Sequence, residues 1–216
     1  MLDNTIKVSV LMTVYNTPFE QVKRAIKSVL QQTYQQFELI IINDGSNTLL
    51  TTKLMAYCQL YQHKIHYTCH PNCGQSESIN KGVQLSNGSY IAIIDADDEY
   101  KPNHLQVCMQ YTMYAQLTYA NTITIANTTA DYYVPDKYDN TKNIHVDNCK
   151  LFATFFGEKK VFETIPFNTM YAADSFFYDE VIKQFKVAKR KERTYIYYRN
   201  NPNSITNSLK NKLQTI

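Results

Sequence analysis

The stretch Tyr90-Ile91-Ala92-Ile93-Ile94-Asp95-Ala96-Asp97-Asp98 decides the fold, because in it an apolar run ends in three carboxylates. A short apolar run rich in β-branched residues is typical of a strand that is buried on both faces. In an open α/β sheet, ligands bind just beyond the carboxyl ends of such strands. We therefore expect Asp95, Asp97 and Asp98 at the rim of a cleft, close together and facing solvent. Nearby carboxylates repel one another unless a cation lies between them, and oxygen ligands of this kind suit Mg²⁺ or Mn²⁺.

An isolated Asp-x-Asp-Asp sequence is more often a solvated turn, so the surrounding chain has to decide. Strands are expected at residues 7–14, 37–42 and 65–69, and helices at 17–30, 50–61 and 76–85. The first helix is predicted to have Thr17 as its cap, Pro18 at its first position and Glu20 closing a capping box. Strands that alternate with helices indicate a parallel sheet, so the polar strand ends at 13–16, 44–46 and 95–98 should meet at one rim.

The second half of the chain is less regular. We expect a helix from 102 to about 114, one strand over 117–125, a loop with a small hairpin over 128–148, and an apolar helix or core element at 151–156. A further helix over 171–185, a strand over 194–198 and a polar tail from 203 complete the chain. Because no linker or internal repeat is evident, we interpret residues 1–216 as one α/β domain.

Composition excludes several classes of protein. The formal net charge of +3 is too small to indicate nucleic-acid binding. The chain holds no apolar run long enough to span a bilayer, and its first residues do not resemble a signal peptide, so a cytoplasmic location is expected. The five cysteines are then expected to be free thiols. No G-x-G-x-x-G follows any expected strand, which disfavours a dinucleotide site. A P-loop is absent as well.

One group of residues could be read as zinc ligands: His66, Cys69, His70 and Cys73. Their spacing matches no common zinc finger, and the first two are expected on a short strand. We therefore favour thiols without a metal at this place.

Taken in order, five motifs resemble glycosyltransferase family 2, which has the GT-A fold, a single domain with a Rossmann-like, mostly parallel sheet flanked by helices. They are VSVLMTVYN at 8–16, SVLQQTY at 28–34, IINDGS at 41–46, NCGQSESINKG at 72–82 and DADD at 95–98. The second half matches more loosely, at 117–121, 165–167, 173–174 and 198–206. The resemblance implies a nucleotide-sugar-binding half at 1–100 and an acceptor-binding half with a C-terminal loop at 101–216.

The resemblance also implies roles on the nucleotide side. Tyr15 would stack on the base, although a core or rim tyrosine is the plain alternative. Asp44 would accept a hydrogen bond from the base, or else serve only as a turn residue. The donor would further contact Thr13, Asn72, Gln75, Asn80, Asp95, Ala96 and Arg199. Many relatives carry an Ala-Arg pair before the residue equivalent to Asn80, where this chain has Ser78 and Ile79.

For the chemistry, the resemblance implies a metal held by Asp97 and Asp95, with Asp98 orienting the site. Asp174 would be the general base of an inverting, single-displacement reaction, with Asp179 and Glu163 as alternatives. A plain alternative for Asp174 is an acidic residue at a helix N-terminus. The family's usual Glu before this position is Ala173 here. Arg199 would move onto the diphosphate from a closing loop, or else be a solvated arginine.

The expected activity is a metal-dependent, inverting transfer of a sugar from a nucleotide donor, expected to be UDP-linked, with Mn²⁺ or Mg²⁺ as cofactor. The acceptor would be a hydroxyl of a glycan, a lipid-linked sugar or a protein. Peripheral contact with a membrane stays open. Two alternatives stay open. One is a degenerate module that binds the nucleotide sugar without turnover. The other is a sugar nucleotidyltransferase, which would need a Gly-rich, Arg-containing loop after the first strand that residues 13–18 do not supply.

Overall fold

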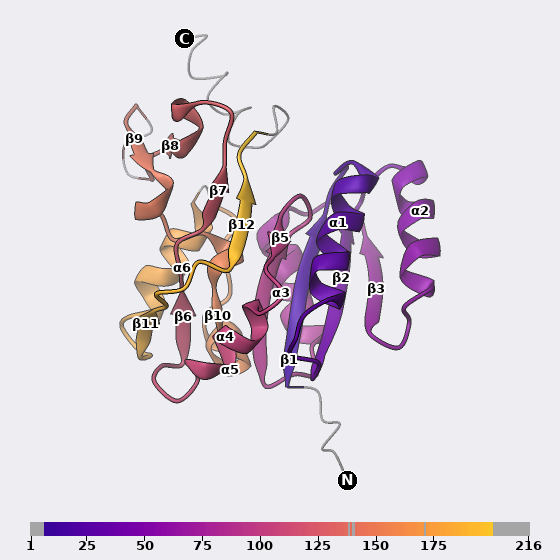
Figure 1. Ribbon diagram of the computed structural model, residues 1–216, viewed down its shortest axis with the longest axis horizontal. Coiled ribbons are helices and arrows are strands. Elements are labelled where there is room, and N and C mark those ends of the chain that lie inside the picture. Colours follow the sequence, from indigo (N-terminus) through magenta and orange to yellow (C-terminus); the bar gives the residue numbers. More distant parts are fainter. Residues whose placement is uncertain (1–6, 138, 140, 171, 201–216) are drawn as a thin grey trace.

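The computed structural model describes residues 7–137, 139, 141–170 and 172–200, and in this part of the chain a seven-stranded sheet runs through the molecule. Its strand order is β11 (Val187–Lys189), β6 (Leu117–Tyr119), β10 (Phe156–Glu158), β4 (Tyr90–Asp95), β1 (Val8–Val14), β2 (Phe37–Asp44) and β3 (Ile65–His70). The four strands of the first half are parallel, and β10 pairs antiparallel with both of its neighbours. Figure 1 shows this sheet with helices on either side.

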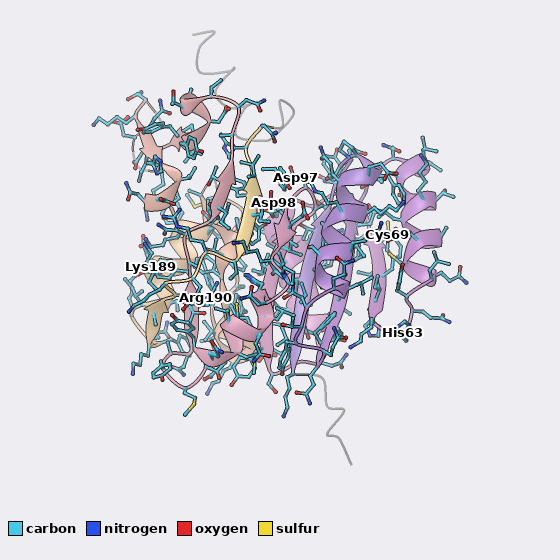
Figure 2. The ribbon with its side chains drawn as sticks, in the orientation of Figure 1. His63, Cys69, Asp97, Asp98, Lys189 and Arg190 are labelled. Carbon is cyan, nitrogen blue, oxygen red and sulfur yellow. The ribbon has the colours of Figure 1, made fainter. Side chains whose placement is uncertain are left out.

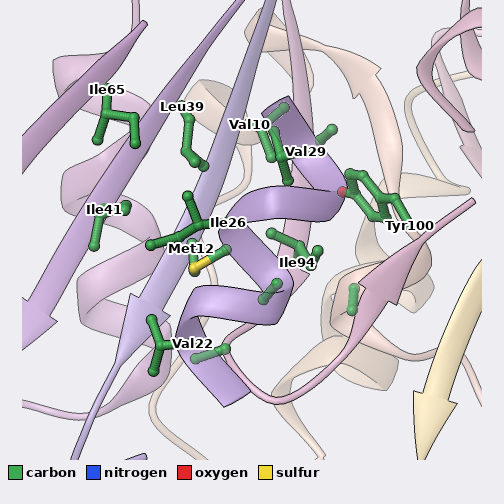
Figure 3. Close-up of a cluster of buried hydrophobic side chains, with 14 of the residues drawn as sticks. Val10, Met12, Val22, Ile26, Val29, Leu39, Ile41, Ile65, Ile94 and Tyr100 are labelled. Atoms are coloured by element: carbon green, nitrogen blue, oxygen red, sulfur yellow. The ribbon is translucent and has the colours of Figure 1, made fainter. Parts of the chain in front are cut away.

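Helices cover both faces of the sheet because successive side chains of the buried strands point in opposite directions. On one face, α1 (Phe19–Leu30) and α2 (Thr48–Gln59) pack on the sheet. Figure 3 shows Val22, Ile26 and Val29 of α1 against the central strands. The other face is covered by α3 (Gln75–Leu85), α5 (Lys159–Thr164) and α6 (Ala173–Val181). The expected mostly parallel α/β architecture is therefore present.

A second, smaller sheet lies beyond the end of β4. It consists of β5 (Glu99–Tyr100), β12 (Tyr195–Tyr198) and β7 (Ile123–Ile125), in that order. Helix α4 (His104–Gln110) follows β5. The expected hairpin is formed by β8 (Tyr133–Pro135) and β9 (Asn143–His145), and short 3₁₀ turns occupy Thr129–Tyr132, Val146–Asn148 and Phe152–Thr154. The small sheet thus brings β12, the last described strand, next to the acidic stretch, which is residues 95–98.

Several local predictions were wrong. Helix α1 begins at Phe19, because Pro18 has the extended ψ of 129° and is the N-cap residue, not the first helical residue. No side-chain hydrogen bond caps this end of the helix. The single strand expected at 117–125 is divided between the two sheets, as β6 and β7. Helix α4 is shorter than predicted. Of the two forms expected for residues 151–156, the structure has the core element, because a 3₁₀ turn leads into β10 with Phe155 and Phe156 buried. The tail from residue 203 lies outside the described residues.

Two broader expectations can be compared with the structure. The five cysteines are free, with Cys58 and Cys108 buried. In the described part of the chain, no helix combines the length and the apolar character needed to cross a membrane.

Candidate active site

The carboxyl ends of β1, β2 and β4 meet at one edge of the large sheet, as the sequence predicted. Thr13 pairs in register with Asp95 of β4 on one side and with Ile42 of β2 on the other. Asp44 is the last residue of β2, so it lies at the same edge. Figure 2 shows Asp97 and Asp98 at this edge, between β12 and α1.

Asp98 differs from the expectation that all three carboxylates face solvent, because it is fully buried. Its Oδ2 accepts a hydrogen bond from the Tyr195 hydroxyl at 2.7 Å, and its Oδ1 accepts one from the Tyr198 backbone N–H at 2.8 Å. The Tyr195 hydroxyl also accepts a hydrogen bond from the backbone N–H of Asp95 at 3.1 Å. Burial, and then the charges of Asp95 and Asp97, raise the pKa of Asp98 well above its ordinary value. Asp98 therefore joins the acidic stretch to β12.

Asp95 and Asp97 keep partial contact with solvent. Burial, and then the neighbouring charge of Asp97, raise the pKa of Asp95 to about 7, against the opposing effect of its hydrogen bond with Gln75. In that bond, Gln75 Nε2 donates to Asp95 Oδ1 at 2.8 Å. Like charges that are held together in this way are relieved by a bound cation, so the two carboxylates suit a hard divalent ion.

An arginine that the sequence analysis did not single out supports the acidic stretch from α1. Arg24 donates to the backbone carbonyl of Asp97, and its guanidinium lies 3.8 Å from the centre of the Tyr198 ring. Arg24 Nε also lies 3.1 Å from Glu99 Oε1, which accepts a hydrogen bond from the Tyr198 hydroxyl at 2.6 Å. Arg24, Tyr195 and Tyr198 all lie more than 70 positions from the acidic residues that they contact, so no local motif could have indicated them.

Asp44 holds the loop that precedes α3. Its carboxylate accepts hydrogen bonds from Asn72 Nδ2 at 3.0 Å, from the Cys73 N–H at 2.8 Å and from the Gly74 N–H at 3.0 Å. The close packing requires Gly45, whose φ is +74° and where an added Cβ would lie 2.5 Å from the backbone nitrogen of Asn72. The predicted nucleotide-side residues Asp44, Asn72 and Gln75 are thus brought together.

Tyr15 follows β1 at the same edge and is 55% exposed. The turn after it is fixed by Asn16, whose Oδ1 accepts hydrogen bonds from the backbone N–H of Asn47 at 2.9 Å and from its side-chain amide at 3.0 Å. The Tyr15 ring is therefore a solvent-facing surface on a fixed turn, which suits stacking.

Asn80 and Arg199 are engaged elsewhere. Asn80 Nδ2 donates to the Phe167 carbonyl at 2.8 Å, and its Oδ1 accepts from the Phe167 N–H at 3.0 Å, so the amide ties α3 to the second half. Arg199 is 1% exposed, not a solvated side chain, and its Nε donates to the Asp131 carbonyl at 3.1 Å. In this arrangement Arg199 supports the region around residue 131.

Asp174 lies in the first turn of α6, after Ala172, which has the left-handed φ of +57°. Burial raises the pKa of Asp174 to about 6, although backbone N–H groups, first that of Ser175, act in the opposite direction. The charge of Asp174 is the smallest of the effects that act on the pKa of Asp95, and it raises that pKa. The two carboxylates therefore interact electrostatically.

The two alternative bases are placed differently. Asp179 is ion-paired with Lys137, and Glu163 is exposed on α5 with Lys159 Nζ at 3.5 Å. Asp174 has a pKa raised to about 6, and its charge is one of the causes that raise the pKa of Asp95. The assignment of Asp174 as the general base stays a prediction.

The model of the family described as "Glycosyl transferase family 2" matches residues 9–178 of this chain. The chain belongs to this family. It is 28% identical over 150 residues to the uncharacterized glycosyltransferase YibD of Escherichia coli, which covers 69% of this chain and 41% of that protein. Across the first three curated relatives, the chain spans only 15% to 41% of their length.

Solved structures support the fold. S. aureus TarS 1-349 in complex with UDP-GlcNAc matches with a TM-score of 0.71 and 15% identity, over 94% of this chain and 60% of that one. A mannosyltransferase of Pyrobaculum calidifontis in complex with GDP-Man and Mn²⁺ matches with a TM-score of 0.69 and 11% identity, over 90% of this chain and 58% of that one. The predicted fold class is confirmed.

Proposed function

We propose that this family 2 chain is a metal-dependent, inverting glycosyltransferase that moves a sugar from a nucleoside diphosphate donor to a hydroxyl acceptor. The observation that carries the proposal is the arrangement of Asp95, Asp97 and Asp98 at the end of β4. The charge of Asp174 acts on Asp95 in this group. The TarS and Pyrobaculum structures carry UDP-GlcNAc in one case and GDP-Man with Mn²⁺ in the other. Of these two donor types, we favour a UDP-sugar.

The residues fit a hard divalent ion such as Mn²⁺ or Mg²⁺. Asp97 and Asp95 offer carboxylate oxygens, and burial together with mutual repulsion raises the pKa of Asp95. Such ions keep several waters and need only one or two protein carboxylates. When bound, the ion would supply neutralisation of the charge on the departing diphosphate.

On the nucleotide side, Tyr15 would stack on the base and Asp44 would contact its edge. Asp44 already accepts three hydrogen bonds from the 72–74 loop. A carboxylate has about four acceptor sites, so one remains for a base N–H. Gln75 and Thr13 would border the ribose and diphosphate, next to Asp95.

In the transfer step, the acceptor oxygen forms a bond to the anomeric carbon as the bond from that carbon to the phosphate oxygen breaks. The nucleoside diphosphate leaves with the electron pair, and Asp174 takes the proton of the acceptor hydroxyl. A pKa of about 6 leaves most of Asp174 ionised at neutral pH while keeping it basic enough to accept that proton. The acceptor hydroxyl belongs to a glycan, a lipid-linked sugar or a protein.

The test is transfer or hydrolysis of nucleotide sugars by the purified chain with Mn²⁺, for wild type, Asp97→Ala, Asp174→Asn and Asp179→Asn. We expect Asp97→Ala to lose turnover and Asp174→Asn to bind UDP with little turnover. Asp179→Asn is the matched control on the same helix and should stay active. Full activity in both Asp97→Ala and Asp174→Asn would refute the role assignments. UDP binding without transfer to a broad acceptor panel would instead indicate a module that only binds the donor.

A further inference from the structure

A second group of potential metal ligands lies away from the acidic stretch, at the ends of β2 and β3. Asp44 ends β2, His70 ends β3 beside it in register, and Cys73 lies in the loop before α3. One ligand atom from each of these residues lies within 4.8 Å of the other two. Figure 2 labels Cys69, the residue before His70, in this part of the molecule. His66, which the sequence analysis considered as a zinc ligand and did not favour, is instead paired with Glu38 at 3.4 Å.

Two of the three distances between the ligand atoms match the edges of a tetrahedral coordination shell, and the third, between Asp44 and Cys73, is within 4.8 Å. His70 Nδ1 lies 3.5 Å from Asp44 Oδ1 and 3.5 Å from Cys73 Sγ. Zinc bonds of about 2.0 to 2.3 Å place neighbouring ligand atoms of a tetrahedron roughly 3.3 to 3.8 Å apart. We propose that Asp44, His70 and Cys73 bind Zn²⁺, with the fourth position open to solvent.

The donor set selects a different metal from the one expected at Asp95 and Asp97. Thiolate and imidazole ligands suit Zn²⁺ and other soft or borderline ions, whereas carboxylates and waters suit Mg²⁺ and Mn²⁺. Cys73 is exposed, so an ion can reach the group from solvent, while Asp44 and His70 are largely buried behind it. The site therefore has two positioned ligands and one accessible thiol.

Neighbouring groups support ligation through His70 Nδ1. His70 Nε2 lies 3.2 Å from the hydroxyl of Ser78, which is fully buried in α3. With zinc on Nδ1, the other ring nitrogen carries the proton and donates it to Ser78 Oγ, which is the arrangement that orients most metal-bound histidines. Asp44 is held in turn by the N–H groups of Cys73 and Gly74.

Two contacts must change when zinc binds. His70 Nδ1 lies 2.7 Å from the Pro71 carbonyl, so a proton held there has to leave. Lys81 Nζ donates to Cys73 Sγ at 3.5 Å and would be displaced by the ion. Zinc binding at this site would therefore replace both contacts.

The site shares Asp44 with the base-binding role given above, and this consequence rests on the proposed function. Zinc on Asp44 Oδ1 uses the acceptor capacity that a base N–H would need. Zinc should therefore weaken binding of a nucleotide. The two ligands would compete for Asp44, next to the 72–74 loop.

Titration with Co²⁺ as a spectroscopic substitute for zinc tests the site directly. Wild type should show a thiolate-to-cobalt absorption band that saturates at one ion per chain and disappears on adding Zn²⁺. Cys73→Ser should lose the band, and the matched variant Cys69→Ser should keep it. Ser78→Ala should weaken binding on the order of 10- to 100-fold. No band in wild type, or a band that survives Cys73→Ser, would overturn the proposal.

A measurement without variants guards against misfolding of the mutants. Zn²⁺ should slow alkylation of Cys73 by iodoacetamide in the wild-type chain and leave Cys69 unchanged, as followed by mass spectrometry. Equal protection of both cysteines, or of neither, would contradict the site. UDP binding, measured by calorimetry with and without Zn²⁺, then tests the antagonism. If UDP does not bind even without zinc, the proposed function fails while the metal site stands on the cobalt result.

Discussion

Replacing Asp95 by Asn should stabilise the metal-free protein at neutral and alkaline pH, even though Asp95 is an expected donor and metal contact. The pKa of Asp95 is raised from 3.8 to about 7 by burial and by Asp97. Between these two values the folded state binds more protons than the unfolded state, so stability falls as pH rises. Below about pH 4 the carboxyl is protonated in both states and the effect vanishes. Asn keeps the Oδ1 acceptor that Gln75 uses and removes the charge.

The size of the effect follows from the pKa shift. About 3 pH units at 1.36 kcal/mol each correspond to about 4 kcal/mol at most. Since Asp95 keeps partial contact with solvent, we expect Asp95→Asn to exceed wild type by about 2–4 kcal/mol at pH 8, or about 4–16 °C in melting temperature. Thermal and urea unfolding in chelator-treated buffer, from pH 4.5 to 8, measure the difference between the two proteins. The difference cancels titration of carboxylates that do not interact with Asp95. Asp98 does interact, and because the charge of Asp95 raises its pKa, Asp98 adds to the same trend.

Excess Mn²⁺ should narrow this gap, because a ligand that binds only the folded wild type raises its stability. The reasoning would be refuted if Asp95→Asn were equal to or less stable than wild type at pH 8 without metal. A gap that did not change with pH would also refute it, because the charge of Asp95 would then not be its cause.

Three further predictions concern the site and its support. The turnover of wild type should rise with pH through about 6 as Asp174 ionises. Asp174→Asn should lose this pH dependence, and its kcat should fall by about 10²–10⁴-fold. If the pH profile of Asp174→Asn equalled that of wild type, Asp174 would be excluded as the base. Tyr195→Phe removes the hydroxyl that donates to Asp98 at 2.7 Å and should cost about 1.5–3 kcal/mol in urea unfolding, whereas an unaltered midpoint would show that the bond is not needed. Gly45 has a φ of +74°, and the Cβ of Gly45→Ala would lie 2.5 Å from a backbone nitrogen, so this variant should lose about 2–4 kcal/mol of unfolding free energy. Gly74 has a φ of +92° but open space around it, so Gly74→Ala should lose less. The reverse order would contradict the packing argument.

The strand ends could be predicted from the sequence because each is a local pattern. The buried runs before Thr13, Asp44 and Asp95 end in polar residues, and parallel pairing alone brings such ends to one edge. The pairing of Thr13 with Asp95 is the outcome of that rule. The start of α1 was missed by one residue, because Pro18 can stand either at the first helical position or just before it.

The burial of Asp98 could not be predicted in the same way. Its partners Tyr195 and Tyr198 lie about 100 positions further along the chain, and the chain has 18 tyrosines, so nothing local distinguishes these two. The strand expected at 117–125 failed for a related reason. Its alternation of polar and apolar residues continues through the point where the backbone leaves the large sheet for the small one, and periodicity does not tell which sheet a strand joins.

The bond between β12 and the acidic stretch also has a consequence for the order of synthesis. Every strand of the large sheet has been made once the chain reaches Lys189 of β11. Asp98 receives its two partners only when Tyr195 and Tyr198 have left the ribosome. The family match ends at residue 178, before either tyrosine, so a chain cut at that boundary would keep the motif but lack the strand that holds it. The acidic stretch therefore depends on β12, a strand that follows every strand of the large sheet in the sequence.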